Sequence, residues 1–141
     1  MKSNRSIPSC AVIPELAYPD VDAAAAWICD ALGFSERLRI GSHRIQLAYG
    51  GAAIVITEGP AEVDPAHAST HGQLLRVDNV DDVFERARRA GAQVIRLPTD
   101  HPFGERQCTI RDLGGHVWTL SQTIADVHPR EWGGELVEDA D

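Results

Sequence analysis

The sequence is poor in cysteine and contains no long apolar run. Its three cysteines, Cys10, Cys29 and Cys108, have no paired spacing typical of a metal knuckle or redox motif, so we expect free thiols. No apolar run reaches the roughly 18 residues that a membrane span needs. No apolar stretch of signal-peptide length follows Lys2 and Arg5 either. These absences predict a cytoplasmic protein that does not associate with membranes.

Basic residues and catalytic motifs are scarce as well. Lysine and arginine total 13 against 21 acidic residues, which gives a formal net charge of −8. An acidic chain repels phosphate backbones, so we expect no nucleic-acid partner. The sequence has no glycine-rich phosphate loop, no G-x-S-x-G elbow and no H-E-x-x-H motif. Because Cys108 has no evident histidine–acid partner, we assign no catalytic residue.

Apolar alternation and turn residues predict a mixed α and β chain. Strands are expected at 11–18, 34–40, 43–49, 52–57, 73–77, 92–97, 106–111 and 116–121. Asp20 is a suitable N-cap for a helix through Leu32 that ends at Gly33. Asn79 is a suitable N-cap for a second helix, which ends at Gly91.

The order of these elements repeats along the chain. Asp20-Val21-Asp22 matches Asn79-Val80-Asp81, and each triplet opens a helix. Gly50-Gly51 and the strand after it match Gly114-Gly115 and the last strand. A strand–helix–three-strand unit therefore occurs twice, at a separation of roughly 60 residues, and a repeat of this kind is a signal about the fold.

The repeat sets the expected domain boundaries. A single domain over residues 10–122 contains module one, at about 10–58, and module two, at about 71–122. A polar, proline-containing link over 58–70 joins the modules. We expect residues 1–9 to be a flexible lead-in, and residues 123–141 to be an acidic tail that docks through Trp132.

Alternation within the strands separates two faces of the predicted sheet. The first face is wholly apolar and should lie under the helices: Leu16, Tyr18, Ile54, Ile56, Leu75, Val77, Trp118 and Leu120. The second face is mixed, as expected for a sheet that lines a cavity: Ile13, Glu15, Ala17, Ala53, Val55, Thr57, Gly72, Leu74, Arg76, Val117, Thr119 and Ser121.

Several segments in this order resemble the vicinal-oxygen-chelate superfamily, of the glyoxalase, bleomycin-resistance and dioxygenase type. They are Tyr18-Pro19-Asp20-Val21, Trp27, Leu32-Gly33-Phe34, Leu75-Arg76-Val77-Asp78, Ala90-Gly91-Ala92 and the segment from Asp112 to Trp118. The stretch from Asp100 to Arg106 is similar to the glyoxalase-like branch. The resemblance covers roughly residues 10–122. It implies an α+β fold in which two βαβββ modules form a cupped, eight-stranded mixed sheet with helices on the outer face.

The resemblance also implies four metal-ligand places. Metal-using members carry ligands on the first and last strand of each module, and these places fall here on Ile13, Val55, Gly72 and Thr119. Divalent metals in cups of this kind need imidazole or carboxylate donors, which these residues do not supply. We therefore expect no metal and no other cofactor.

We interpret the chain as a metal-free protein that binds a small apolar or aromatic molecule in the cup and forms a homodimer. The expected ligand-binding residues are Ile13, Glu15, Val55, Thr57, Leu74, Arg76, Val117, Thr119, Phe103 and Arg106. The alternative is a lyase- or isomerase-type enzyme of the same superfamily, acting without a metal or with one held by the shifted set Glu58, His71 and His116.

Two of these assignments have competing interpretations. Glu15 and Arg76 should form an ion pair between neighbouring first strands, either as a structural contact or as a polar anchor for the ligand. Phe103 and Arg106 lie in a loop that either reaches over the cup mouth or forms a turn in which Arg106 pairs with a carboxylate.

Overall fold

The computed structural model describes residues 2–59 and 71–137. Module one consists of β1 (Glu15–Tyr18), α1 (Val21–Leu32), β2 (Ser35–Ile40), β3 (Arg44–Tyr49) and β4 (Ala52–Glu58). Module two consists of β5 (Gln73–Arg76), α3 (Val80–Arg89), β6 (Gln93–Asp100), β7 (Glu105–Arg111) and β8 (Val117–Thr123), and the short helix η1 (Pro129–Glu131) follows it. The link over 60–70 and the last four residues of the tail lie outside the described residues.

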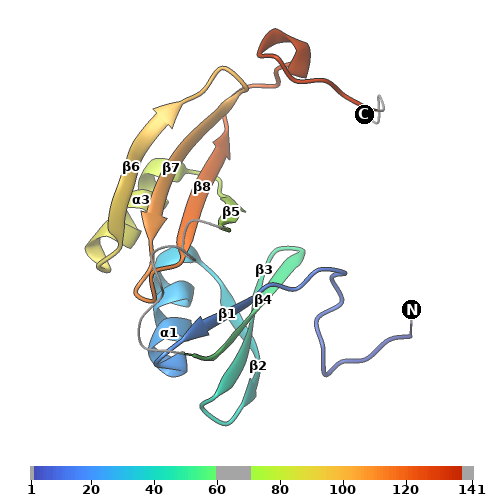
Figure 1. The fold of residues 1–141 in the computed structure, drawn as a ribbon, viewed down its shortest axis with the longest axis vertical. Helices are drawn as coiled ribbons and strands as arrows, with labels where there is room; N and C mark the ends of the chain where they lie inside the picture. The colour runs from blue at the N-terminus through green and yellow to red at the C-terminus, as the bar shows by residue number, and fades with distance from the viewer. Residues whose placement is uncertain (1, 60–70, 138–141) are drawn as a thin grey trace.

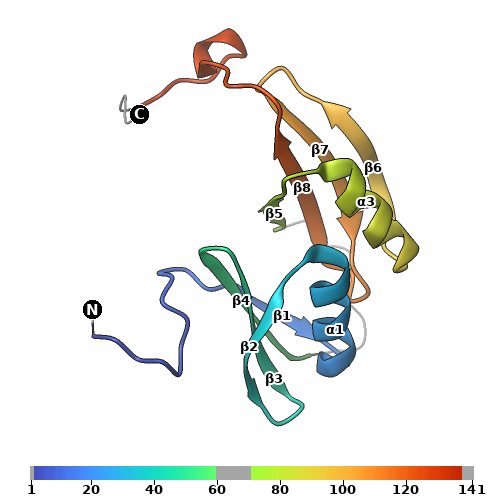
Figure 2. The same cartoon turned by 180° about the vertical axis from the view of Figure 1, so that it is seen from behind.

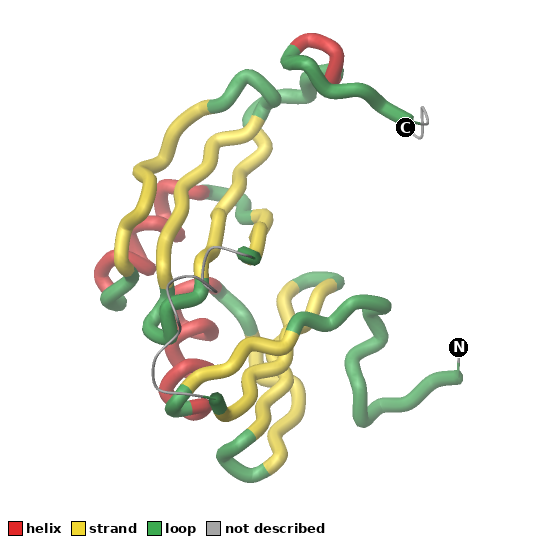
Figure 3. Tube along the Cα trace, in the orientation of Figure 1, coloured by secondary structure: helices red, strands yellow, loops and turns green. Residues whose placement is uncertain are grey.

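The fold is α+β and is built from two βαβββ modules, as the repeat predicts (Figure 1). The eight strands form two four-stranded mixed sheets, with the orders β1-β4-β3-β2 and β5-β8-β7-β6. The two sheets share no strand, and the trace shows them as two separate sheets (Figure 3). In each sheet the first strand of the module pairs in parallel with the last one. No helix in the described ranges is long and apolar enough to cross a bilayer.

The helices begin and end where the capping residues predict. The Asp20 side chain accepts a hydrogen bond from the Ala23 amide at 3.0 Å, and Gly33 closes α1 with a φ of +86°. At the start of α3, the Asn79 side chain accepts from the Asp82 amide at 3.1 Å. Both modules therefore use the same local chemistry to start their helix.

Strand β1 is shorter than the sequence predicts. We expected a strand over 11–18, but pairing with β4 begins only at Glu15. The preceding residue, Pro14, has no amide hydrogen to donate, although its carbonyl still accepts from the Val55 amide at 2.9 Å. Ile13 consequently lies just outside the sheet ladder.

The predicted division of the sheet into two faces is confirmed for the apolar face. All eight residues assigned to lie under the helices are at most 8% exposed: Leu16, Tyr18, Ile54, Ile56, Leu75, Val77, Trp118 and Leu120. They belong to one hydrophobic core that draws on both modules. Burial of this continuous apolar surface is the main stabilising term of the fold.

The modules are joined mainly through their helices, which lie side by side (Figure 2). The Trp27 indole of α1 donates to the Ala90 carbonyl at 2.7 Å. In the other direction, the Arg86 guanidinium of α3 donates to the Ala31 carbonyl at 2.9 Å. Each helix thus satisfies a carbonyl near the C-terminal end of the other one, where backbone acceptors lack intrahelical partners.

A second junction is centred on the buried carboxylate of Asp112. One of its oxygens accepts from the Tyr18 hydroxyl and from the Trp118 indole at 2.9 Å. The other oxygen accepts from the amides of Gly114 at 3.0 Å and His116 at 2.9 Å. Four donors satisfy the carboxylate without a cation, so this polar group is tolerated in a 7% exposed position.

Candidate ligand-binding site

The four metal-ligand places carry side chains that do not fit a divalent metal. Ile13 is half-buried before β1, Val55 is buried on β4, Gly72 is exposed before β5, and Thr119 is half-buried on β8. None of these side chains supplies an imidazole or a carboxylate. Within residues 2–59 and 71–137, no group of three or more His, Cys, Asp or Glu residues is placed to hold a metal ion.

The register of the sheets supports the equivalence of these places between the modules. Glu15 lies opposite Val55, and Leu74 lies opposite Thr119. Ile13 lies two residues before Glu15, and Gly72 lies two residues before Leu74. The cup faces of the two modules are therefore built in the same register, as the internal repeat predicts.

The structure brings together two members of the shifted metal-ligand set. The rings of His71 and His116 have centroids 6.4 Å apart. The His116 Nε2 atom lies 2.8 Å from the Ala17 carbonyl, which requires Nε2 to donate and leaves it unable to coordinate a metal. Glu58 is exposed at the end of β4, opposite Tyr18 in the ladder.

The helix-free face of module two is open and carries an exposed apolar residue. Leu74 on β5 is 66% exposed, whereas its chain neighbour Leu75 is 7% exposed. Val117 and Thr119 on β8 share the open face and are half-buried. An exposed leucine within a strand is a surface that a ligand or a second chain can cover.

Polar side chains on β7 and β8 form a hydrogen-bonded row on the same face. The Ser121 hydroxyl donates to the Glu105 carboxylate at 2.7 Å and accepts from the Gln107 amide at 3.0 Å. The hydroxyls of Thr109 and Thr119 lie 3.4 Å apart. Apolar surface beside orienting polar groups is typical of small-molecule sites.

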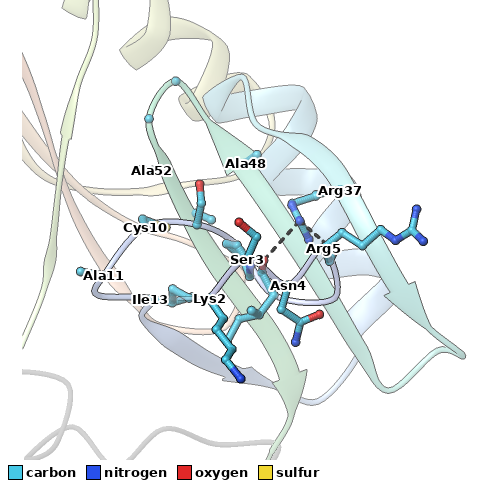
Figure 4. A pocket seen from close by; sticks show the side chains of 16 residues that line it. Lys2, Ser3, Asn4, Arg5, Cys10, Ala11, Ile13, Arg37, Ala48 and Ala52 are labelled. Atoms are coloured by element: carbon cyan, nitrogen blue, oxygen red, sulfur yellow. Dashed lines mark hydrogen bonds between the residues drawn. The ribbon is translucent and has the colours of Figure 1, made fainter.

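The helix-free face of module one is covered instead by the start of the chain. We call residues 2–9 the lead-in; they fold back across β2 and β3, as Figure 4 shows. Gln46, Ala53 and Val55 are all buried, although they lie on the face opposite α1. A hollow of about 710 Å³ is left between the lead-in and the sheet.

Glu15 and Arg76 do not form the expected ion pair, because each has a partner in its own sheet. The Glu15 carboxylate accepts from Arg44 on β3 at 2.6 Å. Arg76 donates to the Thr123 hydroxyl on β8 at 3.1 Å. Thr57 lies opposite Arg44 in the ladder and is half-buried. The prediction was wrong because β1 and β5 belong to separate sheets and are not neighbours.

Arg106 lies on the helix side of its sheet rather than over a cup. Its guanidinium pairs with Asp81 of α3 and with Asp100, each at 3.0 Å. Hydrogen bonds from Arg106 lower the pKa of the Asp81 carboxyl. These contacts match the interpretation of a structural turn with an arginine–carboxylate pair, and we do not retain Arg106 as a ligand-binding residue.

Phe103 connects the β6–β7 loop with the C-terminal segment. Its ring stacks on His101 at a centroid distance of 5.0 Å and contacts Trp132 at 5.5 Å. The expected docking of the tail through Trp132 is therefore present. Phe103 is half-buried in this aromatic group.

Cys108 lies in a setting that disfavours a thiol nucleophile. It is buried on the helix side of β7, and this burial raises the pKa of its thiol to about 11. The reactive thiolate is accordingly suppressed at neutral pH.

Sequence reasoning missed Arg37 and Gln46 on module one, and Glu105 and Gln107 on module two. Gln46 interrupts an apolar strand at a position that alternation assigns to the cup face. Glu105 and Gln107 lie on the face of β7 opposite to buried Cys108. The same period-two alternation could therefore have assigned them to the cup face. Arg37 lies at a β-bulge in β2, where alternation no longer predicts the facing.

Comparison with known families identifies one model along most of the chain. Residues 7–120 match the model of the Glyoxalase/Bleomycin resistance protein/Dioxygenase superfamily. Among curated proteins, an uncharacterized protein of Mycobacterium bovis is 39% identical over 57 residues, which are 40% of this chain. The match spans only 38% of the length of that relative, and 34% of a similar protein of Mycobacterium tuberculosis.

Solved structures give a longer match. TioX from Micromonospora sp. ML1 is 34% identical, with a TM-score of 0.66 over 82% of this chain and 99% of that one. A glyoxalase-related enzyme from Fulvimarina pelagi shares the fold at 18% identity, with a TM-score of 0.66 over 81% of this chain and 88% of that one. A mutant of the fosfomycin resistance protein FosX from Listeria monocytogenes, complexed with Mn(II), shares it at 17% identity, with a TM-score of 0.69 over 90% and 98% of the two chains.

Proposed function

This chain belongs to the Glyoxalase/Bleomycin resistance protein/Dioxygenase superfamily, and we propose that it is a metal-free member that binds a small apolar or aromatic molecule. The ligand would lie against the helix-free faces of the sheets. The proposal depends on the family and on the chemistry of those faces, since the fold alone is compatible with many functions. The three free cysteines favour a cytoplasmic location for this function.

The observation that carries the proposal is the exposure of Leu74 beside a row of orienting polar groups. Leu74 is 66% exposed and lies opposite Thr119 in the ladder. Thr109 and Ser121 lie on the same face within the hydrogen-bonded row. An apolar molecule placed on Leu74 would bury the leucine side chain, and the neighbouring hydroxyls would set its orientation.

The side chains at the metal-ligand places favour binding without a metal. Ile13, Val55, Gly72 and Thr119 supply no imidazole or carboxylate. In the shifted set, His116 commits its Nε2 atom to the Ala17 carbonyl. We therefore do not propose the metal-dependent alternative.

We further propose that the working form is a homodimer in which a second copy covers the open face of module two. The two four-stranded sheets of one chain do not join into a single cup. Leu74 and the edge strand β6, with Ile95 and Leu97 exposed by 47% and 64%, leave apolar surface uncovered. A symmetric pair would bury this surface and enclose a ligand between the copies.

A titration with 8-anilinonaphthalene-1-sulfonate, an aromatic anion that fluoresces in apolar sites, tests the binding function. We expect saturable binding to the folded full chain. The L74A substitution should weaken this binding about fivefold, since it removes about 1 kcal/mol of apolar contact.

The matched control is L113A. Leu113 is 57% exposed but lies in the turn between β7 and β8, so its loss should leave the dissociation constant unchanged. Equal effects of the two substitutions, or no saturable binding by the full chain, would contradict the proposed function.

A further inference from the structure

The lead-in is held on the module-one sheet through its backbone carbonyls. Arg37 of β2 donates to the carbonyls of Arg5 at 3.0 Å and Ile7 at 3.3 Å. Gln46 of β3 donates to the Ser6 carbonyl at 3.0 Å. Three consecutive carbonyl oxygens are thus bound by two side chains, as Figure 4 shows in part.

The two donor side chains are also hydrogen-bonded to each other. The Arg37 guanidinium also donates to the Gln46 side-chain oxygen at 2.5 Å, which orients the Gln46 amide nitrogen toward Ser6. Gln46 is only 6% exposed. It lies opposite Val55, one of the four ligand places of the family, in the β3–β4 ladder. The donors therefore belong to the cup face itself.

The lead-in has few other attachments. Residues 2–7 are exposed, Ile7 by 51%, and only Pro8 is buried. A segment with little buried apolar surface opens more easily than the core. Exchange of the lead-in for another group with acceptor oxygens would therefore leave the core of module one intact.

The charge of the hollow favours an acceptor that is anionic. The sheet side of its lining carries the cation Arg37, and the lining contains no aspartate or glutamate, although the whole chain has a net charge of −8. Lys2 and Arg5 belong to the lead-in and would leave with it. Ile7, Ile13 and several alanines supply apolar wall. A basic lining in an acidic protein raises the local concentration of anions.

We propose that the lead-in is a displaceable strap, and that Arg37 and Gln46 bind the acceptor oxygens of an anionic ligand with an apolar body once the strap has left. The inference rests on the proposed binding function, places ligand contacts on the helix-free face of module one in addition to that of module two, and names the chemistry of the ligand. The strap carbonyls occupy the positions that a carboxylate or sulfonate would take, because the same N–H donors serve both.

Full-length variants and the anilinonaphthalene sulfonate probe test this proposal. P8G removes the buried ring of the strap and keeps both donors, so the probe should bind about threefold more tightly. R37A releases the strap but removes a donor, so the probe should bind about threefold or more weakly than to the wild type. The matched controls are P102G, in an exposed turn, and R39A on the same strand, where Arg39 is held by Asp22 and Glu36.

Site-resolved alkylation by iodoacetamide reports the strap without any ligand. Cys10 lies in the lining of the hollow directly after the lead-in, and buried Cys108 serves as the internal standard. Alkylation of Cys10 should accelerate in P8G and R37A and stay unchanged in the two controls.

Three outcomes would overturn the proposal. Faster Cys10 alkylation with unchanged probe affinity in P8G would mean that the strap does not compete with the ligand. Unchanged alkylation in R37A would mean that Arg37 does not hold the strap. Loss of probe binding by wild type and P8G alike would overturn the proposed function as well, which distinguishes that failure from the first two.

Discussion

The hydroxyl of Tyr18 on β1 donates a hydrogen bond to the buried carboxylate of Asp112, which lies 94 positions later between β7 and β8. Tyr18 is 2% exposed and belongs to the shared core. This contact ties the first strand of module one to the last hairpin of module two. Burial, followed by the charge of Asp112, raises the pKa of the Tyr18 phenol.

The Y18F substitution should destabilise the fold by about 1.5–3 kcal/mol, because it removes a hydrogen bond to a charged, buried acceptor. Asp112 would keep its bond from Trp118 but lose one of its four donors. Urea unfolding measures the loss. The control is Y49F, since the Tyr49 hydroxyl donates to a neutral carbonyl, that of Arg76, at 2.9 Å. Equal losses for both variants would contradict a special role for the Asp112 junction.

Folding stability should decline above pH 9 in part because of Cys108. Its pKa is about 11 in the folded chain against 9.0 for a free thiol. A raised pKa means that the folded state retains the proton longer, so this contribution is complete below pH 9 and is lost as pH rises toward 11. The C108A variant should show a shallower decline than the wild type between pH 9 and 11 in urea unfolding. Parallel curves would show that the thiol does not titrate in this way.

The two adjacent leucines of β5 should differ strongly in their effect on stability. L75A should cost about 2–5 kcal/mol, because Leu75 is 7% exposed and packs in the core. L74A should cost clearly less, because Leu74 is 66% exposed. Thermal unfolding of both variants at the same protein concentration makes the comparison. A larger loss for L74A would mean that the two faces of the strand are exchanged.

The purified protein should contain no stoichiometric divalent metal, because Ile13, Val55, Gly72 and Thr119 supply no suitable donors. Elemental analysis should find far less than one Zn, Ni, Mn or Fe per chain. A chelator should leave probe binding unchanged. About one metal per chain, lost together with binding on chelation, would contradict the proposal.

The protein should be a homodimer at micromolar concentration. Light scattering should give about twice the chain mass of 15.3 kDa. L74E should shift the mass toward that of a single chain, because it places a charge on the open face of module two. The exposed L113E variant serves as the control. A wild-type mass near that of one chain would count against the dimer.

Local patterns predicted the order of the elements and the apolar face of the sheets, although β1 begins later than they indicate. Period-two alternation separated Leu75 from Leu74, and side-chain caps at Asp20 and Asn79 set the helix starts. The internal repeat predicted that Ile13 corresponds to Gly72 and Val55 to Thr119, and the strand register agrees. These features follow from interactions between residues that are close in sequence, or from a comparison of the chain with itself.

Only the tertiary structure decided how distant side chains pair. Glu15 binds Arg44 instead of Arg76, because the first strands of the modules lie in separate sheets. The Asp112 carboxylate finds Tyr18, and the lead-in finds Arg37 and Gln46, through chain folding that no local period encodes. Alternation shows which way a side chain points, whereas its partner depends on how the modules and the start of the chain pack against each other.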